Sequence, residues 1–388
     1  MTSSDPDWHT DEFPELRPRP PWVMEEMMAS QPGLAVDLID DPAPAIGALA
    51  ATLRRVLADG APVTVCGCGT SEHAGAGIAA QLRAAAGPAH AAQIAAVPAF
   101  TAALEPRRGL CIGISHEGGT RATALALEAA HATGALTAAV TAAPQSEVAA
   151  AAETLIVTPS PDRSWCHTVA YTSAILAGAA LAAELGSFRT DGRVAASLLD
   201  MSVADPAARI ARVIAGSRTI LCAGVGVDCI SAREQALKIA EGARIPALAL
   251  ELETVLHGCL AAHDTRDALI IFGLAGATGP DRAARRAEHL ARAADLIGLR
   301  VAAVLNERVD ARLEAGLTTA GRIVIDAPDA APDTGVTPEL RALLGGAVAL
   351  QRLTLELAHV RGTNPDLIRR EEAPYRAAAE AAEGATDW

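Results

Sequence analysis

One unit of sequence occurs twice in this chain: a short apolar strand that runs into a glycine-rich turn and then a helix. In the first half, residues 62–66 lead into Gly67-Cys68-Gly69-Thr70-Ser71, and a helical pattern follows over residues 74–86. In the second half, residues 218–222 lead into Ala223-Gly224-Val225-Gly226 and a helical pattern over residues 231–243. Cys66 and Cys222 are 156 residues apart (222 − 66). A tandem repeat of this length predicts two structural units of the same kind.

Further apolar segments repeat in the same order. Residues 110–114 and 136–141 in the first half have counterparts at 268–272 and 300–305, and an Arg-rich helix is predicted over 281–297. Apolar strands that alternate with helices are typical of parallel sheets covered on both faces. We therefore expect an α/β fold of two tandem, doubly wound, flavodoxin-like domains. The predicted divisions are an N-terminal extension (1–32), a first domain (33–200), a second domain (201–360) and a C-terminal tail (361–388).

The composition excludes several classes of protein. A hydrophobic content of 51% is too high for a disordered chain. The 32 basic and 46 acidic residues give a net charge of −14 without any basic block, which argues against a nucleic-acid or membrane-surface partner. No apolar run reaches the roughly 20 residues of a membrane span, and residues 1–21 lack a signal-peptide pattern. Seven cysteines, an odd number, fit reduced thiols in a cytoplasmic protein.

Almost all of the basic residues are arginines. Lys238 is the only lysine, and the other 31 basic residues are arginines. A bias in genome composition explains the arginines, whereas Lys238 is a position where arginine did not replace lysine. The function of this one residue therefore needs an explanation.

Two turns of the first half have the chemistry of a ligand site. Residues 68–71 and 115–120 are rich in glycine and hydroxyl side chains, and each follows a predicted strand. Open α/β sheets bind ligands beyond the carboxyl ends of their strands, where helix N-termini attract anions. Neither turn has the pattern of a nucleotide-binding loop, so we expect no nucleotide cofactor. A turn that only connects a strand to a helix remains the alternative.

Five segments, in order, resemble the sugar isomerase (SIS) family. More narrowly, they resemble the isomerase half of glutamine–fructose-6-phosphate amidotransferase and the stand-alone double-SIS aminosugar deaminases or deglycases. The resemblance covers roughly residues 20–370. The segments are Trp22-Val-Met-Glu-Glu26 with Gln31-Pro32; Cys68-Gly69-Thr70-Ser71-x-His73-Ala74-Gly75; residues 115–120; Glu234-Gln-Ala-Leu-Lys238-Ile-Ala-Glu241 with His257-Gly258; and Arg361-Gly-Thr-Asn-Pro-Asp366.

The resemblance implies two SIS domains, an ordered tail that folds over the sugar, and a homodimer whose sites are shared between subunits. It assigns Glu241 to proton transfer between C1 and C2, His257 to ring opening from the neighbouring subunit, and Lys238 to orienting Glu241. It implies no metal or other cofactor. The substrate-binding residues that it implies are Cys68, Gly69, Thr70, Ser71, Ser115, His116, Glu117, Gly118, Thr120, His167 and Arg361. A surface ion pair for Lys238 and Glu241, and an interface role for His257, remain the alternatives.

The 115–120 loop departs from the family pattern. His116 and Glu117 stand where the family has glutamine and a second serine at its phosphate loop. A carboxylate repels a phosphate. Either Glu117 points away and pairs with Arg121, or the substrate is not a simple phosphosugar. His167 stands where the family has a serine, but these histidines lack the compact spacing of metal ligands.

The resemblance also lacks two parts of the amidotransferase. The chain has no N-terminal cysteine or preceding glutaminase domain, and the place of the family's tail lysine falls on Ala373. We therefore expect an isomerase or an aminosugar deaminase or deglycase rather than an aminosugar synthase. Two alternatives remain: a sugar-binding regulatory protein without catalysis, and an enzyme of specialised metabolism with a non-phosphorylated substrate.

Overall fold

The computed structural model describes residues 17–159, 161–275, 280–325 and 335–383. Two five-stranded sheets form its framework, with strand orders β2-β1-β3-β4-β5 and β10-β9-β8-β6-β7. All neighbouring strands run parallel. Read from its own first strand, each sheet has the same order, 2-1-3-4-5, which is the doubly wound flavodoxin-like arrangement. The predicted fold class is confirmed.

In the first half, helices alternate with the strands of the first sheet. Their bounds are α1 (Val23–Asp40), α2 (Pro44–Ala58), β1 (Val63–Gly67), α3 (Thr70–Ala86), β2 (Ile94–Pro98), α4 (Ala99–Leu104), β3 (Leu110–Ile114), α5 (Arg121–Ala132), β4 (Leu136–Thr141), α6 (Glu147–Ala150), β5 (Thr154–Val157), α7 (Val169–Gly186) and α8 (Gly192–Leu199). Helix α3 begins four residues before the predicted helix at 74–86. Helix α1 crosses residue 32, where we placed the end of the N-terminal extension.

The second half repeats this alternation and ends in two further helices. Its elements are α9 (Ala204–Ile214), β6 (Ile220–Gly224), α10 (Val227–Lys238), the π-helix η2 (Ile239–Ala243), β7 (Ala247–Glu251), α11 (Leu252–Leu256), η3 (Cys259–Ala262), β8 (Ala268–Gly273), α12 (Pro280–Ile297), β9 (Arg300–Asn306), α13 (Glu307–Asp310), η4 (Ala315–Leu317), β10 (Gly321–Ile325), α14 (Pro338–Arg361) and α15 (Ala373–Glu383). The predicted turn at 273–276 extends beyond the described residues at Gly276.

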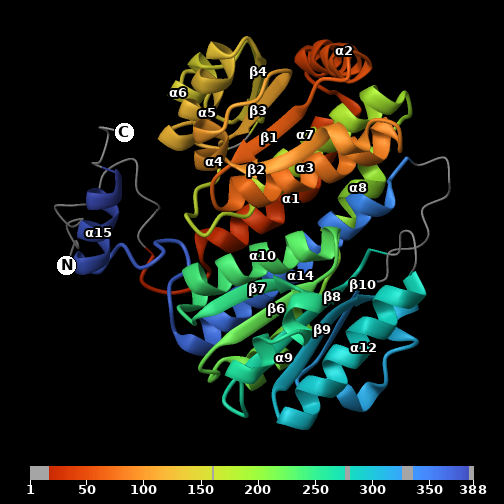
Figure 1. Ribbon diagram of the computed structural model, residues 1–388. Helices are drawn as coiled ribbons and strands as arrows, with labels where there is room; N and C mark the ends of the chain where they lie inside the picture. The colour runs from red at the N-terminus through yellow and green to blue at the C-terminus, as the bar shows by residue number, and fades with distance from the viewer. Residues whose placement is uncertain (1–16, 160, 276–279, 326–334, 384–388) are drawn as a thin grey trace.

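The two sheets lie on either side of a shared layer of helices (Figure 1). Helices α3 and α7 of the first half pack against each other, and α10 and α14 of the second half pack against both α3 and one another. One continuous apolar cluster runs through this layer and onto the inner faces of both sheets. Separate, smaller clusters fill the outer face of each sheet, under α4 and α5 in the first half and under α11 and α12 in the second. Each sheet is therefore covered on both faces.

The repeat is visible in the backbone of the two glycine-rich turns. Gly69 and Gly226 both have positive φ, 55° and 58°, and each precedes the helix that follows the first strand of its sheet. A Cβ on Gly67 would lie 2.7 Å from the Ser71 carbonyl, and one on Gly224 would lie 2.6 Å from the Asp228 carbonyl. Gly67 therefore corresponds to Gly224. The register is one residue away from the Cys66–Cys222 match, so Cys222 corresponds to Val65, and both lie in the shared core.

Helix α7 is long and apolar enough to cross a membrane by length and composition. However, 89% of that helix lies buried inside the protein, and its residues belong to the shared apolar cluster. These 18 residues therefore form a core helix of the protein. Among the described residues, no other helix has these properties.

Candidate active site

A cavity of about 330 Å³ opens where β1 and β3 end, the point at which the strand order of the first sheet reverses. This is where ligands bind in open α/β sheets. Its walls come from both halves of the chain and from the tail. The lining residues are Cys68, Gly69, Thr70, Ser71, Ser115, His116, Glu117, Thr120, Trp165, His167, Glu241, Ile368 and Arg370. The structure thus brings most of the predicted site residues together around one cavity.

The 115–120 loop is held in one shape from both ends. Ser115 Oγ donates a hydrogen bond of 3.1 Å to Thr120 Oγ1, and the carbonyl of Gly118 accepts the N–H of Val148 at 3.1 Å. Gly118 has φ 71°, and a Cβ there would lie 2.0 Å from Ser146 Oγ. Only glycine fits at this position. Gly118 shapes the loop but does not itself line the cavity.

Glu117 faces the cavity without a protein partner. Arg121, the expected partner, pairs with Glu128 instead, at 3.0 Å between Nη1 and Oε1. Within the part of the chain that the structure describes, Glu117 makes no hydrogen bond or ion pair, and it is exposed at the cavity wall. The first of the two alternatives for this residue, a turned-away side chain paired with Arg121, is therefore wrong.

Lys238 lies completely buried beneath the cavity and holds Glu241 at its wall. Its Nζ lies 2.5 Å from Glu241 Oε2 and 3.6 Å from Glu234 Oε1, while Glu241 keeps 21% of its side chain exposed. Burial alone would lower the pKa of Lys238, but the two carboxylates outweigh this effect and raise it, so the lysine stays charged. The predicted pairing is therefore present, and the alternative of a surface ion pair is excluded because Lys238 has no exposed surface.

Glu234 ties this lysine to the first half of the chain. It is fully buried and accepts a hydrogen bond from Thr70 Oγ1 at 3.1 Å, and its Oε2 lies 2.7 Å from His73 Nδ1. Burial works to raise the pKa of Glu234, but Lys238 and His73 together bring it below its usual range. The network joins α3 to α10, so the turn at 68–71 and Glu241 keep a fixed relative position.

Glu241 lies in the short π-helix η2, which follows α10 directly. Single π turns occur frequently at functional sites. Gly242 packs so closely that a Cβ there would lie 2.9 Å from Thr354 of α14. The turn ends at Arg244, which has a left-handed backbone and pairs with Glu371 and Glu372 of the tail. The position of Glu241 is thus fixed from the α14 side and from the tail.

Two histidines of the cavity have pKa values shifted in opposite directions. His116 is 8% exposed, its Nε2 accepts the backbone N–H of Asp162 at 2.8 Å, and burial lowers its pKa to about 4, so it is neutral. His167 Nδ1 lies 3.7 Å from Asp162 Oδ2, an ion-pair distance too long for a hydrogen bond. Burial opposes its charge, but Asp162 raises the pKa of His167 above its usual value. His116 therefore holds the loop as a neutral group, whereas Asp162 favours the charged form of His167.

The tail closes one side of the cavity with residues that the resemblance did not assign. Arg370 lies over the ring of Trp165, 4.6 Å from its centroid, and Ile368 lines the cavity with a left-handed backbone, φ 41°. Positive φ is rare for a β-branched residue and marks local strain. Asp366 accepts the N–H groups of Val23 and Met24 at 2.8 and 2.9 Å, which fastens the tail to the start of α1.

Two predicted site residues lie away from the cavity. His257 follows α11, and its side chain is 76% exposed, with Nε2 3.4 Å from Glu253 Oε2. Arg361 is the exposed last residue of α14. Neither lines the cavity of its own chain.

The second half has the same turn but fills it with its own side chain. Asp228 occupies the position that corresponds to Ser71, is 4% exposed, and accepts the N–H groups of Leu274 and Ala275 at 3.0 and 3.1 Å. These N–H groups follow β8, the counterpart of β3. Burial raises the pKa of Asp228 to about 6, while the two hydrogen bonds partly offset that rise. An internal carboxylate thus takes the place of a ligand here.

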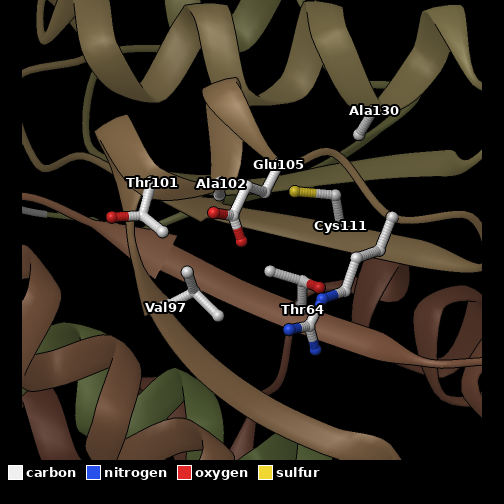
Figure 2. Close-up of a pocket in the computed structure, with 8 residues that line it drawn as sticks. Thr64, Val97, Thr101, Ala102, Glu105, Cys111 and Ala130 are labelled. Carbon is white, nitrogen blue, oxygen red and sulfur yellow. The ribbon is translucent and has the colours of Figure 1, made fainter.

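The described residues contain no group of three or more histidine, cysteine or acidic side chains placed to hold a metal ion. A smaller cavity of about 30 Å³ lies on the outer side of β1 and β3, around Cys111, Thr64 and Glu105 (Figure 2). It has room for about one water molecule and contains none of the predicted site residues.

Comparison with known proteins gives a domain family and a fold. Residues 57–183 match the family model described as "SIS domain". A search of curated protein sequences found no match. The C-terminal domain of glucosamine-fructose-6-phosphate aminotransferase from Francisella tularensis is similar in structure, with a TM-score of 0.70 at 17% identity over 91% of this chain and 99% of that chain.

Two similar structures carry other names. Tagatose-6-phosphate ketose/aldose isomerase from Escherichia coli has a TM-score of 0.68 at 18% identity, over 89% of this chain and 95% of that chain. Glucosamine-6-phosphate deaminase from Thermotoga maritima has a TM-score of 0.64 at 17% identity, over 89% of this chain and 96% of that chain. At these identities the likeness shows the fold alone. The chain therefore contains an SIS domain in its first half, and as a whole it has the fold of these sugar-phosphate enzymes.

Proposed function

We propose that this protein is an enzyme that moves a proton between two adjacent carbons of an open-chain sugar or aminosugar derivative. The outcome is either aldose–ketose isomerisation or removal of an amine. The observation that carries this proposal is the carboxylate of Glu241 at the cavity wall, bonded through Oε2 to the buried Lys238. Proton transfer of this kind needs a positioned general base. The names of the structurally similar isomerase and deaminase support this class of reaction.

The other groups of the cavity have roles that fit this chemistry. Lys238 engages one oxygen of Glu241, which leaves Oε1 to take the proton from one carbon and return it to the next. The hydroxyl groups of Ser71, Ser115 and Thr120 lie at the ends of β1 and β3, where they can bind substrate oxygens. Each hydroxyl can donate and accept, which suits a polyhydroxylated substrate.

Ring opening needs a second acid–base group, and we assign it to His257 of a second copy of the chain. The resemblance implies this role, and the exposed position of His257, outside its own cavity, is compatible with it. Imidazole titrates near neutral pH and can transfer a proton to the ring oxygen. On this proposal the protein acts as a homodimer with shared sites.

Activity assays with a panel of sugars test the proposed reaction. Ketoses and aldoses, with and without a phosphate, are followed for isomerisation, and glucosamine 6-phosphate and fructosamine 6-phosphate for release of ammonia. Glu241→Gln should lower kcat by about 100-fold or more, as expected for loss of a general base. The matched control is Glu184→Gln, which removes an exposed carboxylate of α7. Unchanged kcat in Glu241→Gln would refute the assignment.

Mixing two inactive variants tests the shared site. If Glu241 and His257 of different chains form one site, a mixture of Glu241→Gln and His257→Ala has mixed dimers with one intact site. Random mixing should then restore about a quarter of the wild-type activity, because half of the dimers are mixed. No restoration would mean that both residues act within one chain.

A second candidate function is a sugar-binding regulatory protein without catalysis. The absence of His257 from the cavity of its own chain favours it, as does the lack of any lysine in the tail. Saturable sugar binding without turnover of any sugar in the panel would decide for this alternative.

A further inference from the structure

We propose that the substrate carries no phosphate and has a protonated amine, bound by Glu117, on a carbon outside the reacting pair. This inference rests on the proposed function, because Glu241 marks the reacting end of the substrate. Glu117 and Glu241 reach the same cavity from different elements, the loop after β3 and the π-helix after α10. On this proposal, a group bound by Glu117 belongs to another part of the substrate.

Glu117 is the acidic side chain of the cavity that has no basic partner. Of the two acidic side chains that line the cavity, Glu241 pairs with Lys238, whereas Glu117 has no hydrogen bond or ion pair to any residue in the described ranges. The basic side chains of the wall contact other residues: His167 lies beside Asp162, and Arg370 lies over Trp165. Glu117 does contribute to raising the pKa of His167, so its charge is felt across the cavity. A positive group on a ligand would give Glu117 the basic partner that the protein does not provide.

A phosphate at this loop would meet the carboxylate of Glu117, which the adjacent Arg121 does not neutralise. Arg121, the adjacent arginine, is engaged by Glu128 on the same helix. The loop backbone that carries Glu117 is fixed, because Gly118 and Ser146 are packed together and the N–H of Val148 bonds the Gly118 carbonyl. The α5 N-terminus favours an anion, and on this proposal the Glu117 side chain is that anion.

An ammonium group suits the loop better than a neutral hydroxyl. It has three N–H donors and no acceptor. Glu117 can accept one of these donors in a charge-assisted hydrogen bond, and the oxygens of Ser115 and Thr120 at the same wall can accept others. The three side chains thus form an acceptor set for a primary amine.

Binding of four sugars tests the proposal. The probes are D-glucose, D-glucose 6-phosphate, 6-amino-6-deoxy-D-glucose and D-glucosamine, and Kd is measured by calorimetry on the full chain. We expect the 6-amino sugar to bind at least about tenfold tighter than glucose, the effect of one charge-assisted hydrogen bond. Glucose 6-phosphate should bind more weakly than glucose. D-Glucosamine, with its amine at C2, should gain nothing from Glu117.

Three variants separate the charge of Glu117 from general effects. Glu117→Gln should abolish the preference for the 6-amino sugar, and Glu117→Ser should tighten binding of glucose 6-phosphate by about tenfold or more. Glu184→Gln, with the same change of net charge at an exposed site on α7, should leave all four Kd values unchanged. Tightest binding of glucose 6-phosphate to the wild type, or no measurable binding of the 6-amino sugar, overturns the proposal. A preference that survives in Glu117→Gln overturns it as well.

Repeating these measurements in Glu241→Gln keeps this inference separate from the proposed function. The charge preference should persist there, since Glu241 lies at the other end of the substrate. Turnover that depends on Glu241 but is fastest with a phosphosugar would leave the function standing and overturn the inference. A Glu117-dependent amine preference without any turnover would do the reverse.

Discussion

Lys238 is the one lysine of the chain, and it is completely buried between two carboxylates. The compact ammonium can face Glu234 and Glu241 at once. A guanidinium, planar and larger, would need a different arrangement of acceptors. The sequence bias toward arginine therefore stops at a position where the shape of the cation matters.

Removing this lysine should destabilise the fold as well as the site. Lys238→Met leaves Glu234, which is fully buried, without its cation. Loss of one partner of a buried ion pair lowers the free energy of unfolding by about 3–5 kcal/mol. Urea unfolding measures this loss, and the double variant Lys238→Met/Glu234→Gln should recover part of it. A loss below about 1 kcal/mol would show that the carboxylates find other partners.

His116 should make stability depend on pH. Burial lowers its pKa to about 4 in the folded protein, against about 6.5 in an unfolded chain. The unfolded chain therefore binds more protons between these values. The contribution of His116 is complete above about pH 6.5 and declines as the pH falls toward 4, by about 3 kcal/mol.

The variant His116→Gln isolates this effect, because glutamine can accept the Asp162 N–H without titrating. The difference in unfolding free energy between wild type and variant should shift against the wild type as the pH falls from 7 to 4.5. Unfolding in urea at a series of pH values measures it. A difference independent of pH would contradict a buried neutral histidine.

At the scale of elements, the two segments at the ends of the described chain depend on each other. Asp366 receives the first N–H groups of α1, and the carbonyl of the same residue accepts the N–H of Trp165 at the cavity wall. One aspartate thus fixes the tail, the start of α1 and the loop that carries Trp165. The sequence presents these as three separate motifs.

Asp366→Ala should loosen all three segments. The two hydrogen bonds to a helix N-terminus involve a carboxylate, and their loss lowers the free energy of unfolding by about 1–3 kcal/mol. Thermal unfolding measures this loss, and limited proteolysis should cut near residues 362–375 sooner than in wild type. Asp37→Ala, an exposed site on α1, is the matched control. Equal proteolysis of both variants would show that the tail is held by other contacts.

The central strands could be predicted from the sequence, and the edge strands could not. Residues 110–114 and 136–141 coincide with β3 and β4, because central strands are continuous apolar runs. The edge strands β2 and β7 have weaker burial patterns and no such signal. The π-helix around Glu241 also has no sequence signal; it packs against α14, and Arg244 at its end pairs with the tail.

At the scale of the whole molecule, the two repeats share one core. The apolar cluster between the sheets contains residues of α1, α3, α7, α10 and α14 without a break. Neither half could bury this surface alone. The repeat in the sequence predicts two units but says nothing of the area between them.

The shared core predicts unfolding in one step. Circular dichroism at 222 nm and tryptophan fluorescence, in which Trp22 and Trp165 report from near the tail, should give the same midpoint in urea. Two separate transitions would show that the halves unfold independently. A fragment that contains only residues 1–200 should expose the inner faces of α3 and α7 and aggregate.

The sequence could predict the site residues at the strand ends, but not those of the tail or the placement of residues relative to a second copy. The turn at 68–71 and the 115–120 loop lie at one cavity, because strand ends at the same sheet edge have to meet. Glu241 reaches that cavity from the π-helix of the second half, and only the family resemblance predicted its place there. Ile368 and Arg370 could not be predicted, since a tail follows no strand or helix periodicity. His257 and Arg361 lie elsewhere in one chain, and sequence cannot place a residue relative to a second copy.

The twin turns at Gly69 and Gly226 keep both glycines but differ at three positions, and the difference between Ser71 and Asp228 has an evolutionary meaning. Asp228 gives the backbone N–H groups after β8 a permanent partner from within the chain. A duplicated domain whose backbone N–H groups are already bonded by its own aspartate needs no ligand at that turn. Helix α10 of the second half instead lies next to the cavity of the first half. The network of Glu234, Lys238 and Glu241 lies on that helix and the π turn that follows it. The two halves of one polypeptide thus contribute different parts of the same cavity.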